Sequence, residues 1–299
     1  MKPPCVAFAL LLPAAVAAEE ARPPAETPVP ITWDEVQALP RPAPDHRIPY
    51  GEGGVRFGEL RLPRGDGPFP VVVLIHGGCW MAEYGLDELA GAGGALAEQG
   101  VAVWSLEYRR VGNPGGGWPG TFKDTAQGID HLRDLAQRFP LDLDRVVLAG
   151  HSAGGHLALW AAARHNLPAT SPLYTRDPLA VRGVVSLAGI TDLTSYGSGP
   201  RDCNQAVARL LGGGPDRFPR RYREGNPALP LGVPARLVQG TLDPIVPADQ
   251  ARRFADAATA QGDDARLLLI EGAGHFDLIA PSTAAWATVR KAILELLAR

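Results

Sequence analysis

The sequence has little cysteine, little net charge and no hydrophobic run long enough for a membrane span. Only three of its 299 residues are cysteines, so a network of disulfides cannot hold the fold together. The formal net charge of −3 gives no reason to expect nucleic acid or an anionic membrane as a partner. The seven histidines show no HExxH or similar spacing, so neither a metal nor another cofactor is predicted.

The first 18 residues resemble a secretory signal peptide. Lys2 precedes an apolar stretch over 6–16, and small residues at 16–18 would allow cleavage before Glu19. The apolar stretch is too short to span a bilayer as a stable helix. We therefore expect a secreted or periplasmic protein. Residues 19–47, rich in Pro and Ala, predict an extended lead-in with one short helical turn over 33–39.

Two cysteines, Cys79 and Cys203, remain after removal of such a signal. An oxidising compartment permits a disulfide between them. Cys79 lies inside a motif at the end of a strand, and this position favours a free buried thiol. The sequence alone leaves the pairing open.

From residue 48 onward, strand-like and helix-like segments alternate. Strands are predicted at 55–62, 71–75, 101–108, 145–149, 181–188, 235–239 and 265–270, and helices at 86–99, 121–139, 155–163, 247–261 and 283–298. This alternation predicts one α/β domain with a mostly parallel sheet covered on both faces. The segment 192–234 interrupts the pattern, contains one short helix near 203–211, and is expected to form a cap over the site.

The strongest motif is the stretch Gly150-His151-Ser152-Ala153-Gly154, which fits G-x-S-x-G. It follows a short apolar strand and precedes an alanine-rich helix, and this strand–turn–helix order is the context in which the motif indicates a nucleophilic serine. Small residues at both glycine positions allow a tight turn that leaves the Ser152 hydroxyl exposed at the carboxyl end of the strand. The helix N-terminus then favours negative charge at the reaction site. Ser152 is the predicted nucleophile.

An oxyanion hole is predicted from the sequence His76-Gly77-Gly78-Cys79-Trp80, which follows the strand at 71–75. Two glycines after a central strand let the backbone turn and present N–H groups. We expect Gly78, together with Gly77 or Cys79 and with Ala153, to hold the oxyanion. Trp80 is expected near the mouth of the substrate pocket.

A serine nucleophile needs a base and an acid elsewhere in the chain. His275, in a glycine-containing loop after the strand at 265–270, is the predicted base. Asp243 follows the strand at 235–239 and is the predicted acid, since its carboxylate could hold the far nitrogen of His275. Asp192, which follows the strand at 181–188, is the alternative acid. His151 and His156 are expected to pack or form hydrogen bonds beside the nucleophile, and His76 to brace the loop with the two glycines. The other histidines are expected on the surface: His46, His131 and His165.

These four motifs together resemble the α/β-hydrolases, and more narrowly the group of esterases similar to kynurenine formamidase. The matching stretches are HGGCW at 76–80, GHSAGGH at 150–156, GTLDPIVP at 240–247 and GAGHFDLI at 272–279. The resemblance covers residues 48–299 and implies an α/β-hydrolase fold. It further implies a triad of Ser152, Asp243 and His275, with Gly77, Gly78 and Ala153 around the oxyanion.

The predicted activity is hydrolysis of small carboxylic esters through an acyl-serine, with a small-molecule ester or amide as substrate. Alternatives are an arylformamidase or amidase, a serine peptidase resembling the prolyl oligopeptidase catalytic domain, and a non-catalytic binding module. The intact triad argues against the last. The expected cap carries scattered arginines in place of a broad apolar patch, which disfavours lipase action. These arginines form either a solvated face or a site for a substrate carboxylate or phosphate. The arginines of the segment are Arg201, Arg209, Arg217, Arg220, Arg221 and Arg223.

Overall fold

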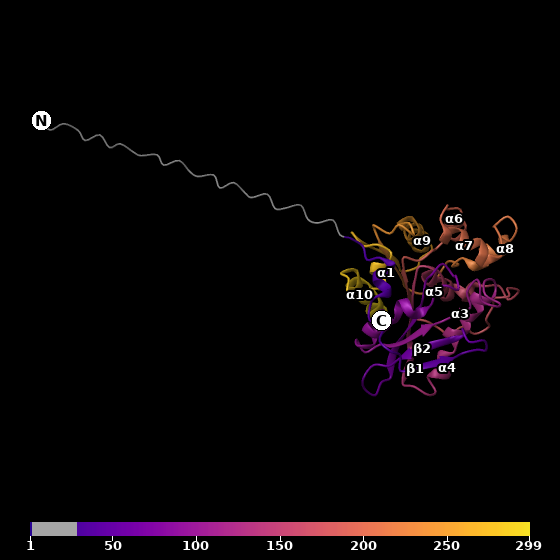
Figure 1. The fold of residues 1–299 in the computed structure, drawn as a ribbon, viewed down its shortest axis with the longest axis horizontal. Coiled ribbons are helices and arrows are strands. Elements are labelled where there is room, and N and C mark those ends of the chain that lie inside the picture. Colours follow the sequence, from indigo (N-terminus) through magenta and orange to yellow (C-terminus); the bar gives the residue numbers. More distant parts are fainter. Residues whose placement is uncertain (2–28) are drawn as a thin grey trace.

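One mixed sheet forms the centre of the protein (Figure 1). The computed structural model describes residues 29–299 and Met1, so the predicted signal peptide lies outside the described residues. The eight strands follow the order β1-β2-β4-β3-β5-β6-β7-β8, in which the pairs β1–β2 and β2–β4 are antiparallel and the others parallel. They are β1 (His46–Pro49), β2 (Phe57–Arg61), β3 (Phe69–Ile75), β4 (Ala102–Leu106), β5 (Leu141–His151), β6 (Gly183–Leu187), β7 (Ala235–Gly240) and β8 (Ala265–Ile270).

The mostly parallel sheet predicted from the sequence is confirmed, but one strand was not predicted. β1 lies where the extended lead-in was expected to end, and it pairs with β2 at the edge of the sheet. Only Ile48 of its four residues is buried, so the sequence carries no alternating pattern there. The short helical turn expected nearby is present as α1 (Trp33–Gln37), whose N-cap Thr32 and Glu35 form a capping box.

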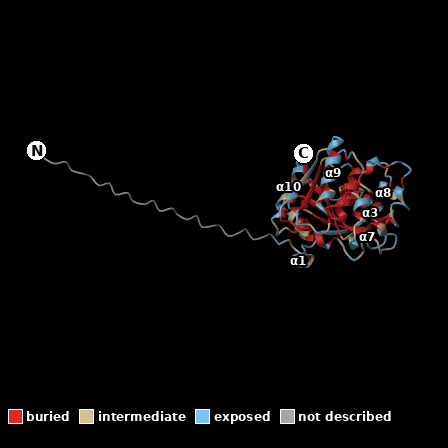
Figure 2. Ribbon diagram, turned by 90° about the horizontal axis from the view of Figure 1, so that it is seen from above, coloured by how far each residue is buried: buried red, intermediate tan, exposed pale blue. Residues whose placement is uncertain are grey.

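Helices cover both faces of the sheet, and most of the buried residues lie in its strands and in the helix faces packed on them (Figure 2). The strand side chains alternate between two buried cores. In β3, Val73 and Ile75 enter one core, whereas Val72 and Leu74 enter the other. This alternation explains why the strand is a continuous apolar run. The first core includes side chains from α3 (Gly120–Asp130), α5 (Ala153–Ala163) and α9 (Ala248–Ala260), and the second from α2 (Ala90–Ala97) and α10 (Ala285–Leu297). In the described part of the chain, no helix has both the length and the apolar character to cross a membrane.

Two of the predicted helices differ from the expectation. The segment predicted as one helix over 86–99 begins as a 3₁₀ helix, η1 (Leu86–Leu89), before α2. The helix predicted over 121–139 is divided at His131 into α3 and α4 (Leu132–Leu135). At this division the N–H of Asp134 bonds the carbonyl of His131, three residues earlier, which tightens the turn.

The expected cap segment contains three short helices where the sequence predicted one. They are α6 (Leu193–Gly197), α7 (Asp202–Leu211) and α8 (Pro219–Gly225). The side chain of Asp192 accepts the N–H of Thr194 and caps α6. Pro219 is the first residue of α8, a position whose N–H would have no partner within the helix. Helix α7, the predicted one, is anchored by buried Val207 and Leu210.

The expectation of a free thiol at Cys79 is wrong, because Cys79 and Cys203 form a disulfide. Cys79 lies in the loop after β3, and Cys203 is the second residue of α7. Packing of α7 on the core brings the two Cα atoms to 5.3 Å, within the range that a disulfide requires. The partners are 124 residues apart, so only the tertiary fold brings them together. Disulfides typically stabilise a fold by about 2–4 kcal/mol, and more when the closed loop is long.

Candidate active site

Ser152 lies at the sharp turn between β5 and α5, as the G-x-S-x-G motif predicts. Its φ of 54° is in the left-handed region, which is unfavourable for a residue with a side chain. Its N–H donates to the carbonyl of Leu187 on the neighbouring strand β6, and this bond helps to hold the turn. A Cβ atom at Gly154 would collide with the backbone of Ile75, so α5 starts against the end of β3 only because this residue is glycine.

The loop after β3 lies beside this turn and has an unusual backbone. Three consecutive residues, Gly78, Cys79 and Trp80, have positive φ angles of 83°, 52° and 58°. A Cβ atom built on Gly77 would be 3.1 Å from the Cβ atom of Ser152, so the loop touches the nucleophile. In residues 29–299, neither the N–H of Gly78 nor that of Ala153 donates a hydrogen bond. These two groups are therefore available to a developing oxyanion.

Gly77 cannot serve as the oxyanion donor that the sequence suggested. Its N–H donates to Oε1 of Glu88 at 2.6 Å, and the Glu88 carboxylate is buried. Burial alone would raise the pKa of Glu88, but its hydrogen bond to His151 and the charges of His151 and His76 lower the pKa overall. An ionised carboxylate is a strong acceptor, so it holds the Gly77 N–H away from substrate. Sequence reasoning missed Glu88, because no motif marks a carboxylate eleven residues after the loop.

The structure brings the predicted base and acid together. Nδ1 of His275 lies 2.7 Å from Oδ2 of Asp243, and both side chains are almost fully buried. Because an ionised carboxylate only accepts hydrogen bonds, Nδ1 carries the hydrogen and Nε2 is left as the acceptor. This is the tautomer that a general base needs. The other oxygen of Asp243 accepts the N–H groups of Ile245 and Val246, which fixes the carboxylate.

His275 lies next to the nucleophile turn through His151. Nε2 of His151 donates to the carbonyl of His275 at 3.1 Å, and the two rings are 4.5 Å apart. Within the described residues, Ser152 and His275 share no hydrogen bond. Such bonds are often long without substrate and shorten in the reactive complex. The role expected for His151, hydrogen bonding beside the nucleophile, agrees with these contacts.

Asp192, the alternative acid, has a different role in the structure. Its Oδ1 accepts the N–H of Thr194 at 2.9 Å and the side-chain amide of Asn226 at 3.4 Å. Thr194 lies in the first turn of α6, and Asn226, which follows α8, also accepts the N–H of Leu193 at the start of α6, so the carboxylate caps that helix. The carboxylate that contacts His275 is Asp243.

Trp80 does not lie at the mouth of a pocket, contrary to the expectation. Its side chain is fully buried and meets the ring of His156 edge-on, with ring centroids 5.3 Å apart. Burial lowers the pKa of His156 to about 4, so this histidine is neutral near pH 7 and forms part of the core beneath the loop. The positive φ of Trp80 turns its side chain inward, and the motif letters alone carried no signal for that direction.

Comparison with known proteins shows the family of this chain. A family model described as BD-FAE matches residues 59–257, more than half of the chain. The chain belongs to the BD-FAE family. It is 30% identical over 243 residues to isoprenylcysteine alpha-carbonyl methylesterase ICME of Arabidopsis thaliana, covering 77% of this chain and 56% of that protein. It is 29% identical over 249 residues to esterase LipC of Mycobacterium tuberculosis, covering 78% of this chain and 60% of that protein.

The fold of this BD-FAE family member is also found among solved structures. A truncated carbohydrate esterase from gut microbiota matches with a TM-score of 0.73 at 20% identity, covering 85% of this chain and 95% of that one. Together with the strand order, this match shows the α/β-hydrolase fold that the sequence predicted. The chain spans between half and two thirds of the length of the two curated relatives.

Proposed function

We propose that this protein hydrolyses small carboxylic esters through an acyl-enzyme on Ser152. The bond between His275 and Asp243 is the observation that carries the proposal, because it sets the base tautomer beside a strained serine. The names of the curated relatives, a methylesterase and an esterase, support an ester over an amide as the bond that is cleaved.

The reaction follows from these positions. Nε2 of His275 takes the proton of the Ser152 hydroxyl as its oxygen attacks the ester carbonyl. The negative charge that develops on the carbonyl oxygen is met by the N–H groups of Gly78 and Ala153. The C–O bond then breaks, and His275 gives its proton to the departing alcohol. Water, activated by the same histidine, releases the acid and restores the serine.

Small substrates are favoured over lipid aggregates by the surface of the expected cap. Among the described residues, no exposed large hydrophobic side chain lies in 192–234. Those elsewhere are scattered singly along the chain: Met1, Val29, Tyr174, Leu242 and Leu269. A lipase cap would need a broad apolar patch to meet an oil surface.

We also propose that the protein is exported, and the Cys79–Cys203 disulfide supports this because disulfides persist in oxidising compartments.

The proposed function is tested by a side-by-side substrate panel. We expect turnover of p-nitrophenyl acetate and butyrate to exceed that of N-formylkynurenine, of a dipeptide chromogen and of emulsified triolein. The Ser152→Ala variant serves as the blank for every substrate. Faster cleavage of N-formylkynurenine would instead favour the arylformamidase alternative, and cleavage of the dipeptide would favour the peptidase. Activation at an oil–water interface would contradict the preference for small esters.

The pH dependence follows from the pKa of His275. Burial and the charge of His151 lower this pKa below 6.5, although Asp243 opposes the change. Because the base must be neutral, activity is present above the pKa and is lost as the pH falls through it. We expect the acid limb of kcat/KM for ethyl butyrate, followed by pH-stat, to lie below pH 6.5.

A matched variant tests the cause of this shift. Replacing His151 by Gln removes a neighbouring positive charge, so the acid limb of His151→Gln should move to higher pH than that of the native protein. An acid limb above pH 6.5 in the native protein, or no movement in the variant, would contradict this assignment.

A further inference from the structure

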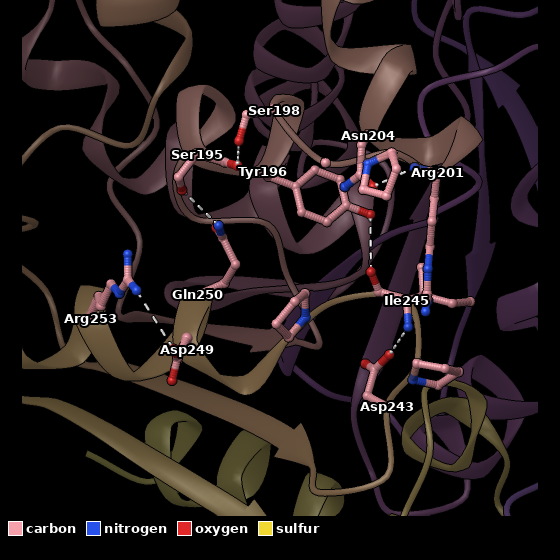
Figure 3. Close-up of a pocket in the computed structure, with 14 residues that line it drawn as sticks. Ser195, Tyr196, Ser198, Arg201, Asn204, Asp243, Ile245, Asp249, Gln250 and Arg253 are labelled. Atoms are coloured by element: carbon pink, nitrogen blue, oxygen red, sulfur yellow. Dashed lines mark hydrogen bonds and ion pairs between the residues drawn. The ribbon is translucent and has the colours of Figure 1, made fainter.

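A pocket of about 610 Å³, lined by charged, polar and apolar residues, opens at the loop that carries Asp243 (Figure 3). One wall is formed by α6 and the first turn of α7, including Arg201 and Asn204. The opposite wall is the loop between β7 and α9 together with the start of α9, including Asp249 and Arg253. Asp243 is one of the lining residues, whereas Ser152 and His275 are not, so the pocket adjoins the triad on the side of its acid.

The disulfide places this pocket within reach of the oxyanion loop. Cys203 lies between Arg201 and Asn204 in the sequence, and Cys79 directly follows Gly78. The two cysteine Cα atoms are 5.3 Å apart. Adding about 3.8 Å for each neighbouring residue gives at most about 13 Å between the Cα atoms of Gly78 and Asn204. This separation is short enough for one small substrate to bridge the oxyanion loop and the pocket.

The charged side chains that line the pocket balance in number, Arg201 and Arg253 against Asp243 and Asp249, but they are not all paired with one another. The carboxylate of Asp243 is turned toward His275 and its own loop. Asp249 already pairs with Arg252 at 2.7 Å and with Arg253 at 3.6 Å. Arg201 makes no ion pair within residues 29–299, although the exposed Asp202 follows it outside the pocket lining. One guanidinium of the pocket thus has no anionic partner.

Asn204 adds an oriented donor beside this guanidinium. Its Oδ1 accepts the backbone N–H of Arg201 at 3.0 Å, and the residue is 7% exposed. With the oxygen used in this way, the NH₂ group of the amide is the part left to bind a ligand. A planar guanidinium and an amide donor together match the two oxygens of a carboxylate.

We propose that this pocket binds a carboxylate on the substrate, with Arg201 as its main ligand and Asn204 as a second donor. The inference rests on the proposed ester hydrolysis and adds the substrate class, esters that carry a carboxylate away from the scissile bond. It also gives one of the six arginines of the expected cap a specific role.

Charge selectivity measured in two substrate series tests this inference. In the first, the charge is on the acyl side: p-nitrophenyl half-esters of C4 to C8 dicarboxylic acids against neutral esters of equal length. In the second, it is on the alcohol side: acetoxyalkanoic acids against alkyl acetates. We expect the native protein to prefer the anionic ester in at least one series. Arg201→Ala should lower the anionic-to-neutral ratio of kcat/KM about twofold to fivefold, the size of an exposed charge contact.

Two controls separate this role from general damage. Arg209 lies further along the same helix, is exposed and does not line the pocket, so Arg209→Ala should keep the ratio of the native protein. The preference should also weaken as salt is raised from 20 to 500 mM, because salt screens an exposed charge pair. A ratio unchanged in Arg201→Ala, or a native preference for neutral esters in both series, would overturn the inference.

A binding measurement decides the question even if no ester is turned over. Monoethyl adipate is titrated by calorimetry into Ser152→Ala and into the double variant Ser152→Ala with Arg201→Ala. We expect the second variant to bind about twofold to fivefold more weakly. Equal affinity would overturn the carboxylate site. Weaker binding without hydrolysis of any ester by the native protein would support the site while refuting the proposed function.

Discussion

The Ser152→Ala variant should lose ester hydrolysis by about 10⁶-fold in kcat, the loss typical when the nucleophile of a serine hydrolase is removed. The variant keeps the backbone of the turn, because alanine places the same Cβ atom at the φ of 54° that the serine already occupies. What it removes is the oxygen that forms the acyl-enzyme. The N–H groups of Gly78 and Ala153 remain, so a small residual rate above that in water is expected.

A covalent probe independently tests whether Ser152 is the nucleophile. A fluorophosphonate should label the native protein at one residue, identified by peptide mass spectrometry as Ser152, and should not label Ser152→Ala. Ser282→Ala, a substitution at an exposed serine outside the four motifs, is the matched control and should label fully. Circular dichroism and Tm should show that both variants fold. Labelling that survives in Ser152→Ala would contradict the assignment of the nucleophile.

The parts of the site that the sequence predicts are those held by local geometry. Ser152 could be placed because a strand, a tight glycine turn and a helix follow one another within a short stretch. Asp243 and His275 each follow a strand, and in a parallel sheet the carboxyl ends of neighbouring strands meet at one edge. The register of β7 against β8 brings their two loops together, and the contact between the side chains follows.

The parts that could not be predicted depend on contacts between distant segments. Glu88 takes the N–H of Gly77 only because the helix after the loop folds back against it. Trp80 is buried because three positive φ angles in a row turn its side chain into the core. The disulfide needs α7 to be placed against the same loop. None of these features has a periodicity or a spacing that marks it in the sequence.

The Asp243→Asn variant should lower kcat about 10⁴-fold while leaving the fold intact, as in serine hydrolases whose acid is replaced by its amide. In the native protein, Oδ1 of Asp243 accepts two backbone N–H groups of its loop, and Oδ2 accepts from His275 and from the amide of Gln239. The carbonyl oxygen of asparagine can satisfy the loop in the same way. Its NH₂ group would then face the ring nitrogen of His275.

That exchange reverses the tautomer of the base. Nδ1 of His275 becomes the acceptor and the hydrogen moves to Nε2, which then cannot take the serine proton. We expect ¹⁵N NMR of labelled histidine to show the hydrogen on Nε2 in Asp243→Asn and on Nδ1 in the native protein. The control is Asp192→Asn, which changes only the cap of α6 and should leave kcat within about twofold, since a cap affects stability by about 1 kcal/mol. A larger loss of kcat in Asp192→Asn than in Asp243→Asn would show that the wrong carboxylate supports the base.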